Sequence, residues 1–272
     1  MKNFIRSRLE KIFGKKFTEY LFIIYKVLRN PKNFKLLFYS KKKDLKYNQD
    51  LFILLKKDVQ EINQTIKNKL GIEYDDEKCS WHYHIFASLK TLDKINILEI
   101  GTYDGKFANF LSDIFPNGNI YTIDLPDEDQ RFIHSYKREE RHLREKFIYD
   151  RDQRLNKNNI FQIKMDSNNI MNKFKPKFFD LIWVDGDHRE PQVSTDINNS
   201  IELINKNGVI CCDDIIMRDY KDDYVSNESY LRLNQLEKDK IIKNNFFLKR
   251  CNRNNRILKK FISFSTLKND TK

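Results

Sequence analysis

Apolar residues recur in two different rhythms along the chain, and the change falls near residue 90. Before it, apolar residues recur every three or four positions, which is the period of amphipathic helices. After it, short apolar runs alternate with helical segments, which predicts a parallel sheet with helical crossovers. The expected strands are Ile95–Ile100, Asn119–Ile123, Ile160–Met165, Phe179–Val184 and Gly208–Cys212, followed by a hairpin of Phe246–Arg250 and Ile257–Phe264 around a turn at 252–255.

This pattern predicts an α/β fold with a doubly wound, mostly parallel seven-stranded sheet. Residues 91–266 form this domain, and residues 1–90 form a basic helical extension or cap. Helices are expected at 4–13, 17–28, 51–70, 106–115, 192–204 and 229–242, and within the charged link 125–159. That link is expected to be helical and largely solvated, and a lid over the ligand crevice is one role considered for it.

The segment Trp81-His82-Tyr83-His84 permits two interpretations. On a strand, the two imidazoles would lie on one side and could bind a metal ion. On a helix they would diverge, and the segment would then contribute an aromatic wall to the pocket.

The net charge of +12 comes almost entirely from residues 1–46, which hold fourteen basic and three acidic residues. This segment either packs on the body or on a partner subunit, or binds an anionic membrane or glycan surface. The rest of the chain carries a net charge of only +1, so a nucleic-acid partner is not expected. The apolar run 20–25 is too short to span a bilayer.

Cysteine usage and the first residues suggest a cytoplasmic protein. The four cysteines form no C-x-x-C pair, which favours reduced thiols. Met1–Leu9 is charged and does not resemble a signal peptide. Cys211 and Cys212 are neighbours in an expected strand, so their side chains should point to opposite faces of the sheet.

Acidic residues end four of the expected strands. Glu99 precedes a turn framed by Gly101 and Gly105, and the later strands end at Asp124, Asp166 and Asp185. In such sheets the carboxyl ends of the strands form the ligand crevice. Glycine permits positive φ and a close approach of the backbone. The pattern predicts a nucleotide-like ligand at this edge.

Over residues 89–265 these motifs resemble the class I S-adenosylmethionine-dependent methyltransferases, although Tyr103 replaces the middle glycine of their commonest first motif. In that family, an acid at the position of Asp124, 23 residues after Gly101, binds both ribose hydroxyls. The position of Asp166 and Ser167 contacts the adenine amine. The resemblance implies S-adenosyl-L-methionine as cofactor, bound by Glu99, Gly101, Thr102, Tyr103, Gly105, Asp124, Leu125, Asp166, Ser167 and Asp185.

A second motif, Asp185-Gly186-Asp187-His188 with the later pair Asp213-Asp214, resembles metal-dependent small-molecule and sugar O-methyltransferases. The resemblance implies that Asp185, Asp213 and Asp214 bind Mg²⁺, which prefers oxygen ligands. It also implies that Asp187 or His188 acts as the catalytic base. The ordinary pKa range of histidine favours His188 as the base, whereas the resemblance favours Asp187. In relatives without a metal ion, the same turn orients the cofactor or caps the next helix.

The function expected from this resemblance is methyl transfer to a hydroxyl of a small molecule or sugar, such as a surface-glycan precursor. The protein would act in the cytoplasm or on the inner face of the membrane, as a monomer or a homo-oligomer. Three alternatives remain open. They are a metal-independent methyltransferase acting on a small-molecule amine, RNA or protein, a non-catalytic cofactor-binding module, and an NAD-dependent enzyme on the same fold.

Overall fold

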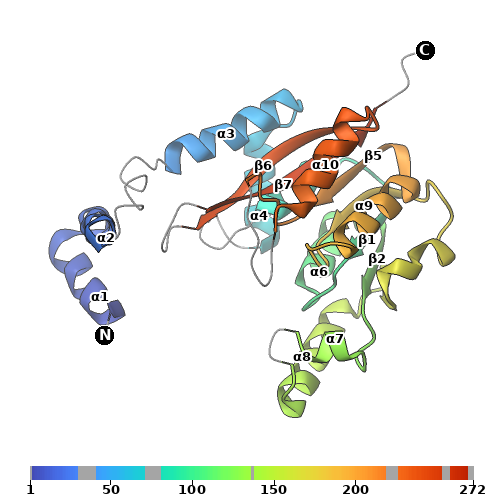
Figure 1. Ribbon diagram of the computed structural model, residues 1–272, viewed down its shortest axis with the longest axis horizontal. Coiled ribbons are helices and arrows are strands. Elements are labelled where there is room, and N and C mark those ends of the chain that lie inside the picture. Colours follow the sequence, from blue (N-terminus) through green and yellow to red (C-terminus); the bar gives the residue numbers. More distant parts are fainter. Residues whose placement is uncertain are drawn as a thin grey trace.

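A seven-stranded sheet forms the centre of the molecule (Figure 1). The computed structural model describes residues 2–29, 41–70, 81–135, 138–218, 226–252 and 258–268. The strand order is β3-β2-β1-β4-β5-β7-β6, with β1 to β5 parallel and β7 antiparallel to both of its neighbours. The strands are β1 Asn96–Ile100, β2 Asn119–Asp124, β3 Ile160–Lys164, β4 Phe179–Val184, β5 Ile204–Cys212, β6 Ile242–Asn252 and β7 Leu258–Leu267.

The fold class and all seven predicted strands are confirmed. β5 begins earlier than predicted, and both hairpin strands are longer than predicted. Residues 253–255 of the predicted hairpin turn lie outside the described residues.

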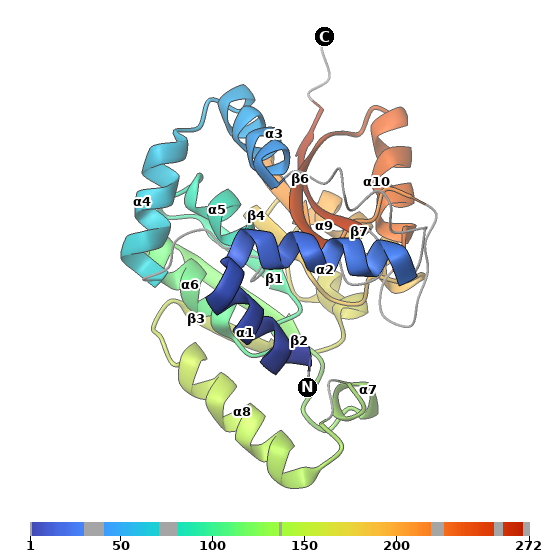
Figure 2. The same ribbon diagram turned by 90° about the vertical axis from the view of Figure 1, so that its left-hand side faces the viewer.

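Helices cover both faces of the sheet (Figure 2). They are α1 Lys2–Phe13, α2 Lys15–Arg29, α3 Lys41–Leu54, α4 Val59–Leu70, α5 Trp81–Ala87, α6 Lys106–Ile114, α7 Gln130–Ile133, α8 Arg141–Leu155, the short 3₁₀ helix η2 Ser167–Asn172, α9 Gln192–Leu203 and α10 Glu228–Lys238. The charged link is helical, as predicted. The Trp81–His84 segment is helical too, so the strand alternative with two aligned histidines is wrong.

The single helix predicted over residues 51–70 is wrong in one respect, because the chain breaks between α3 and α4. Lys56 has a φ of 56°, which an α-helix does not contain. The Asp58 side chain then accepts hydrogen bonds from the backbone N–H groups of Gln60 (2.8 Å) and Glu61 (3.1 Å) and so caps α4. The spacing of apolar residues continues from α3 into α4, so this spacing could not predict the break between them.

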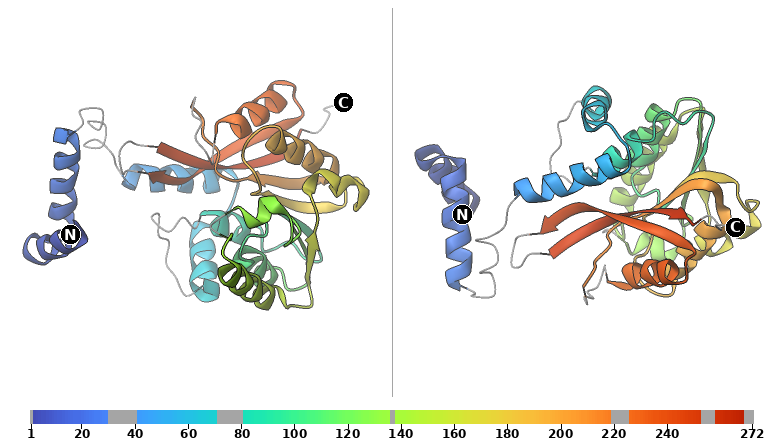
Figure 3. Two further views of the ribbon diagram at one scale, coloured as in Figure 1. Left: turned by 60° about the horizontal axis from the view of Figure 1, so that its bottom comes forward. Right: turned by 90° about the horizontal axis from the view of Figure 1, so that it is seen from above.

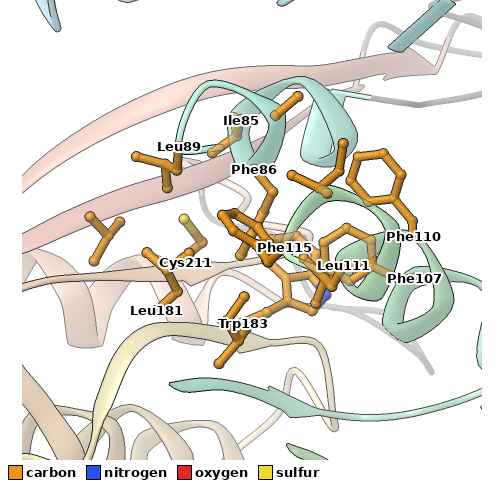
Figure 4. Packing of buried hydrophobic residues seen from close by; sticks show 14 of the residues in the cluster. Ile85, Phe86, Leu89, Phe107, Phe110, Leu111, Phe115, Leu181, Trp183 and Cys211 are labelled. Carbon is orange, nitrogen blue, oxygen red and sulfur yellow. The ribbon is translucent and has the colours of Figure 1, made fainter. Parts of the chain in front are cut away.

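Two apolar cores lie on opposite faces of the sheet. One face packs against α3 to α6, with rings from Phe86, Phe107 and Trp183 at its centre (Figure 4). The other face packs against α9, α10 and η2. Cys211 belongs to the first core and Cys212 to the second, which confirms that their side chains point to opposite faces.

Helices α1 and α2 lie apart from the sheet, side by side with each other (Figure 3). Several of their large apolar side chains are exposed, with relative exposures between 49% and 78%. These are Ile12, Phe13, Phe17, Tyr20, Tyr25 and Leu28. None of the described helices is long and apolar enough to cross a membrane.

A buried ion pair fixes α8 against the loop that follows β2. The side chain of Arg151 is fully buried and donates two hydrogen bonds to the carboxylate of Asp127, at 2.7 and 3.0 Å. Lys164, at the end of β3, donates to the same carboxylate at 2.7 Å. Both neighbouring cations lower the pKa of Asp127, against the opposing effect of burial.

We predict that Arg151→Met lowers the free energy of unfolding by about 3 kcal/mol, because it leaves Asp127 buried with one partner fewer. The control is Arg141→Met on the same helix. Its partner is Glu145 at 2.7 Å, but both side chains are exposed, so a much smaller loss is expected. Urea unfolding measures both changes, and equal losses would contradict the role given to the buried pair.

Candidate active site

The turn after β1 brings two strand-end loops into direct contact. Gly101 has a φ of +101°, and its N–H donates to the carbonyl of Ile123 at 2.8 Å. A Cβ at this position would lie 2.2 Å from the carbonyl oxygen of Asp185. Glycine is therefore required here by the close approach of the loop after β4, as well as by its backbone conformation.

The rest of the turn is held by Asp124 at the end of β2. The carboxylate of Asp124 accepts hydrogen bonds from the backbone N–H groups of Leu125 (2.8 Å) and Tyr103 (3.1 Å). Tyr103 adopts a left-handed conformation with a φ of 48°, and Gly105 follows at 75°, where it begins α6. Burial raises the pKa of Asp124, although the two backbone bonds oppose that effect.

Glu99 lies beneath this turn and is almost completely buried, with 1% exposure. The hydroxyl of Thr122 donates to Glu99 Oε2 at 2.5 Å, and the hydroxyl of Thr102 lies 2.5 Å from that of Thr122. Burial, and to a smaller extent the negative charges of Asp185 and Asp124, hold the pKa of Glu99 well above its usual range. Glu99 and Thr102 thus form one buried polar chain under the predicted cofactor site.

Asp166 and Ser167 lie at the end of β3, as predicted. The Asp166 carboxylate accepts from the N–H of Asn168 at 2.9 Å and pairs with Arg131 at 2.8 Å. The Ser167 hydroxyl accepts from Nε2 of Gln192 at 2.9 Å. All ten predicted cofactor residues therefore lie on or next to the turns that follow β1, β2, β3 and β4.

The two candidate bases have different surroundings. The Nε2 of His188 lies 3.3 Å from Oδ1 of Asp185, and its side chain is only 13% exposed. The carboxylate of Asp187 is 44% exposed and accepts three hydrogen bonds from the backbone and guanidinium of Arg189, at 3.0 to 3.1 Å. Burial acts to lower the pKa of His188, but the contact with Asp185 outweighs it and raises the pKa.

Asp213 and Asp214 directly follow β5, and their carboxylates form ion pairs with two lysines. The Lys249 ammonium contacts the carboxylate of Asp213 and lies 3.0 Å from Oδ1 of Asp214. The Lys260 ammonium lies 2.5 Å from Oδ2 of Asp214. Burial raises the pKa of Asp214, but the two lysines outweigh it and hold the pKa far below its usual range.

Asp185, Asp213 and Asp214 lie at neighbouring strand ends, as predicted, but as placed they do not fit a Mg²⁺ ion. An ammonium group competes with a divalent cation for the carboxylate oxygens that it contacts. Two ammonium groups hold three of the four oxygens of the acidic pair, whereas Oδ1 of Asp213 is buried without a hydrogen-bond partner among the described residues. In the part of the chain that the structure describes, no group of three or more His, Cys, Asp or Glu residues is arranged to bind a metal ion.

Sequence reasoning missed three buried polar residues of this region, Lys249, Lys260 and Asp196. Each lies on the same side of its strand or helix as residues of the apolar core. For example, Phe247 lies two positions before Lys249, and Ile262 lies two positions after Lys260. Asp196 lies on α9 with 1% exposure, and burial raises its pKa to about 6. A charged residue within a core-facing stripe was the signal that could have identified all three.

Comparisons with known proteins agree with this geometry. Residues 98–215 match the family model of a methyltransferase domain. The matched segment runs from β1 to the residues just after β5 and covers less than half of the chain. The match and the observed fold together favour methyl transfer as the chemistry of this segment. A search of curated protein sequences found no match.

Two solved structures share the fold of this protein. One is described as a candidate O-methyltransferase from Klebsiella pneumoniae, with 12% identity and a TM-score of 0.50 over 82% of this chain and 96% of that chain. The other is the O-methyltransferase TomG from Streptomyces achromogenes in complex with SAM. It has 14% identity and a TM-score of 0.50 over 85% of this chain and 100% of that chain.

We predict that Asp124→Asn weakens binding of S-adenosylhomocysteine by roughly 10- to 100-fold, because the amide replaces a charged acceptor of the ribose hydroxyls. Asp113→Asn on α6 is the control, since its carboxylate pairs with Lys157 instead. Isothermal titration calorimetry measures both affinities. Unchanged affinity of the Asp124 variant would refute the assignment of the ribose-binding acid.

Proposed function

We propose that this methyltransferase transfers the methyl group of S-adenosylmethionine to a hydroxyl oxygen of a small molecule or a sugar. The observation that carries the proposal is the contact between His188 and Asp185, at 3.3 Å, beside the cofactor turn. An imidazole that is held by a carboxylate can accept the proton of a hydroxyl group. The descriptions of the two structural relatives as O-methyltransferases support the same choice of acceptor.

In this mechanism the neutral imidazole of His188 removes the proton from the acceptor hydroxyl. The oxygen lone pair then forms a bond to the methyl carbon, while the carbon–sulfur bond breaks and its electron pair returns to sulfur. Asp185 stabilises the imidazolium that forms, and solvent takes the proton afterwards. Because the pKa of His188 is raised, activity should increase with pH until the imidazole is deprotonated.

We predict that His188→Gln lowers kcat by about 10²- to 10⁴-fold, since the variant loses a general base, while its affinity for S-adenosylhomocysteine is retained. Asp187→Asn should have a much smaller effect, because Arg189 already engages that carboxylate. His142→Gln, on the exposed face of α8, is the control.

The measurement is transfer of labelled methyl from S-adenosylmethionine to fractionated lysate, followed by identification of the methylated atom. The opposite ranking would make Asp187 the base, and exclusive N-methylation would refute the proposal.

The Mg²⁺ ion expected from the resemblance takes no part in this proposal. Its predicted ligands Asp213 and Asp214 are paired with lysines, so no step is assigned to a metal ion. A glycan precursor as acceptor and a homo-oligomeric state also stay predictions.

We further propose that α1 and α2 attach the enzyme peripherally to an anionic membrane, on its cytoplasmic side. Exposed apolar side chains on these helices and a net charge of +11 over residues 1–46 support this proposal. Each cation near an anionic surface contributes on the order of 1 kcal/mol, and buried aromatic rings add to it.

We predict that the double variant Phe13→Ser/Phe17→Ser loses most of its binding to vesicles that contain phosphatidylglycerol, because both rings are exposed and lie 5.7 Å apart. Leu143→Ser, at an equally exposed position on α8, should bind as the wild type does. Co-sedimentation measures the bound fraction. Wild-type binding to purely zwitterionic vesicles at the same level, or full binding by the double variant, would contradict the membrane proposal.

A further inference from the structure

Two lysines from the C-terminal hairpin reach the acidic edge of the sheet. Lys249 on β6 is 9% exposed, and Lys260 on β7 is 8% exposed. Lysine is rarely buried to this extent, because removing the ammonium group from water is costly unless it is paired. Here both are paired with the carboxylates that follow β5.

Lys249 occupies the more central position of the two. Its ammonium bridges Asp213 and Asp214, whereas Lys260 contacts only Asp214. Asp214 has a left-handed backbone conformation, with a φ of 51°. Its Oδ1 contacts Lys249 and its Oδ2 contacts Lys260, so both carboxylate oxygens face the hairpin. The charge of Lys249 also lowers the pKa of Asp185, against the larger effect of burial, so this ammonium contacts two of the predicted metal ligands and acts on the third through its charge.

We propose that the Lys249 ammonium is the fixed cation of this site and takes the place of a divalent metal ion. The role in methyl transfer rests on the proposed function above. An ammonium group has three N–H donors, and Asp213 and Asp214 account for two of them. The third donates to the acceptor oxygen as that oxygen loses its proton.

The chemical contribution of Lys249 is electrostatic, and Lys249 transfers no proton of its own. His188 takes the acceptor proton, the oxygen bonds to the methyl carbon, and the electron pair of the carbon–sulfur bond returns to sulfur. The negative charge that develops on the acceptor oxygen is balanced by the ammonium, which is already oriented by two carboxylates and needs no reorganisation. A lysine is a compact point charge, which suits a single oxygen.

The charges of the cluster also disfavour a metal ion. Removing Lys249 would leave Asp213 and Asp214 with Lys260 alone, and would release the oxygens that Lys249 now holds. The inference therefore predicts that loss of this lysine creates affinity for a divalent cation that the wild type lacks.

The first experiment measures metal binding, independently of any acceptor. Wild type, Lys249→Met and Lys243→Met are purified with EDTA and titrated with Mn²⁺ alone, with the bound fraction followed by electron paramagnetic resonance. Lys243 lies exposed on the same strand and serves as the matched control. Wild type and Lys243→Met should bind no Mn²⁺ tightly, and Lys249→Met should bind at least tenfold more tightly than either. Tight binding by the wild type that Asp213→Asn abolishes would overturn the inference.

The second experiment measures catalysis. Methyl transfer by the wild type should be unchanged in EDTA. Lys249→Met should lower kcat by about 100-fold with the affinity for S-adenosylhomocysteine unchanged, as for the loss of an oriented charge. Lys249→Arg keeps the charge and should retain metal-free activity, which guards against misfolding of the Met variant. Activity that EDTA removes and Mg²⁺ restores would refute the role of Lys249. If no acceptor is methylated on oxygen, the proposed function fails, while the Mn²⁺ titration still decides whether lysine replaces the metal ion.

Discussion

The contact between the backbone of Gly101 and the carbonyl of Asp185 is the constraint on which the site depends. A side chain at residue 101 would separate two loops that leave adjacent parallel strands, β1 and β4. One loop carries the cofactor turn, and the other carries the acid and histidine proposed for proton transfer. Their close approach brings the predicted cofactor site and the proposed base to the same edge of the sheet, as the geometry of parallel strands permits.

The sequence predicted the central strands well because β1, β4 and the second half of β5 are buried on both faces. Such strands appear as continuous apolar runs, and acids at their ends mark the edge where the ligand binds. The helix break at Lys56 was not predictable, since the apolar period of α3 continues into α4. The pairing of Arg151 with Asp127 was also hidden, because a tertiary contact between residues 24 positions apart has no local pattern.

The candidate site was predicted as a set of acids, whereas the structure contains acids that are paired with lysines. Sequence motifs locate Asp185, Asp213 and Asp214 because they directly follow strands. The compensating cations come from a hairpin that packs beside β5 only in the folded sheet. The resemblance to metal-dependent relatives predicts a positive charge at this place, and in the folded structure two lysine ammonium groups lie there.

The position of β7 between β5 and β6 has a consequence for the order in which the protein is made. The ribosome completes the cofactor turn and all three acids of the cluster before it adds Lys249 and Lys260. A nascent chain that ends before residue 249 thus exposes uncompensated carboxylates and an unpaired edge of β5, which is a surface for wrong partners. The hairpin of β6 and β7 closes that edge and pairs Asp213 and Asp214 with lysines, so assembly of the site waits for this hairpin.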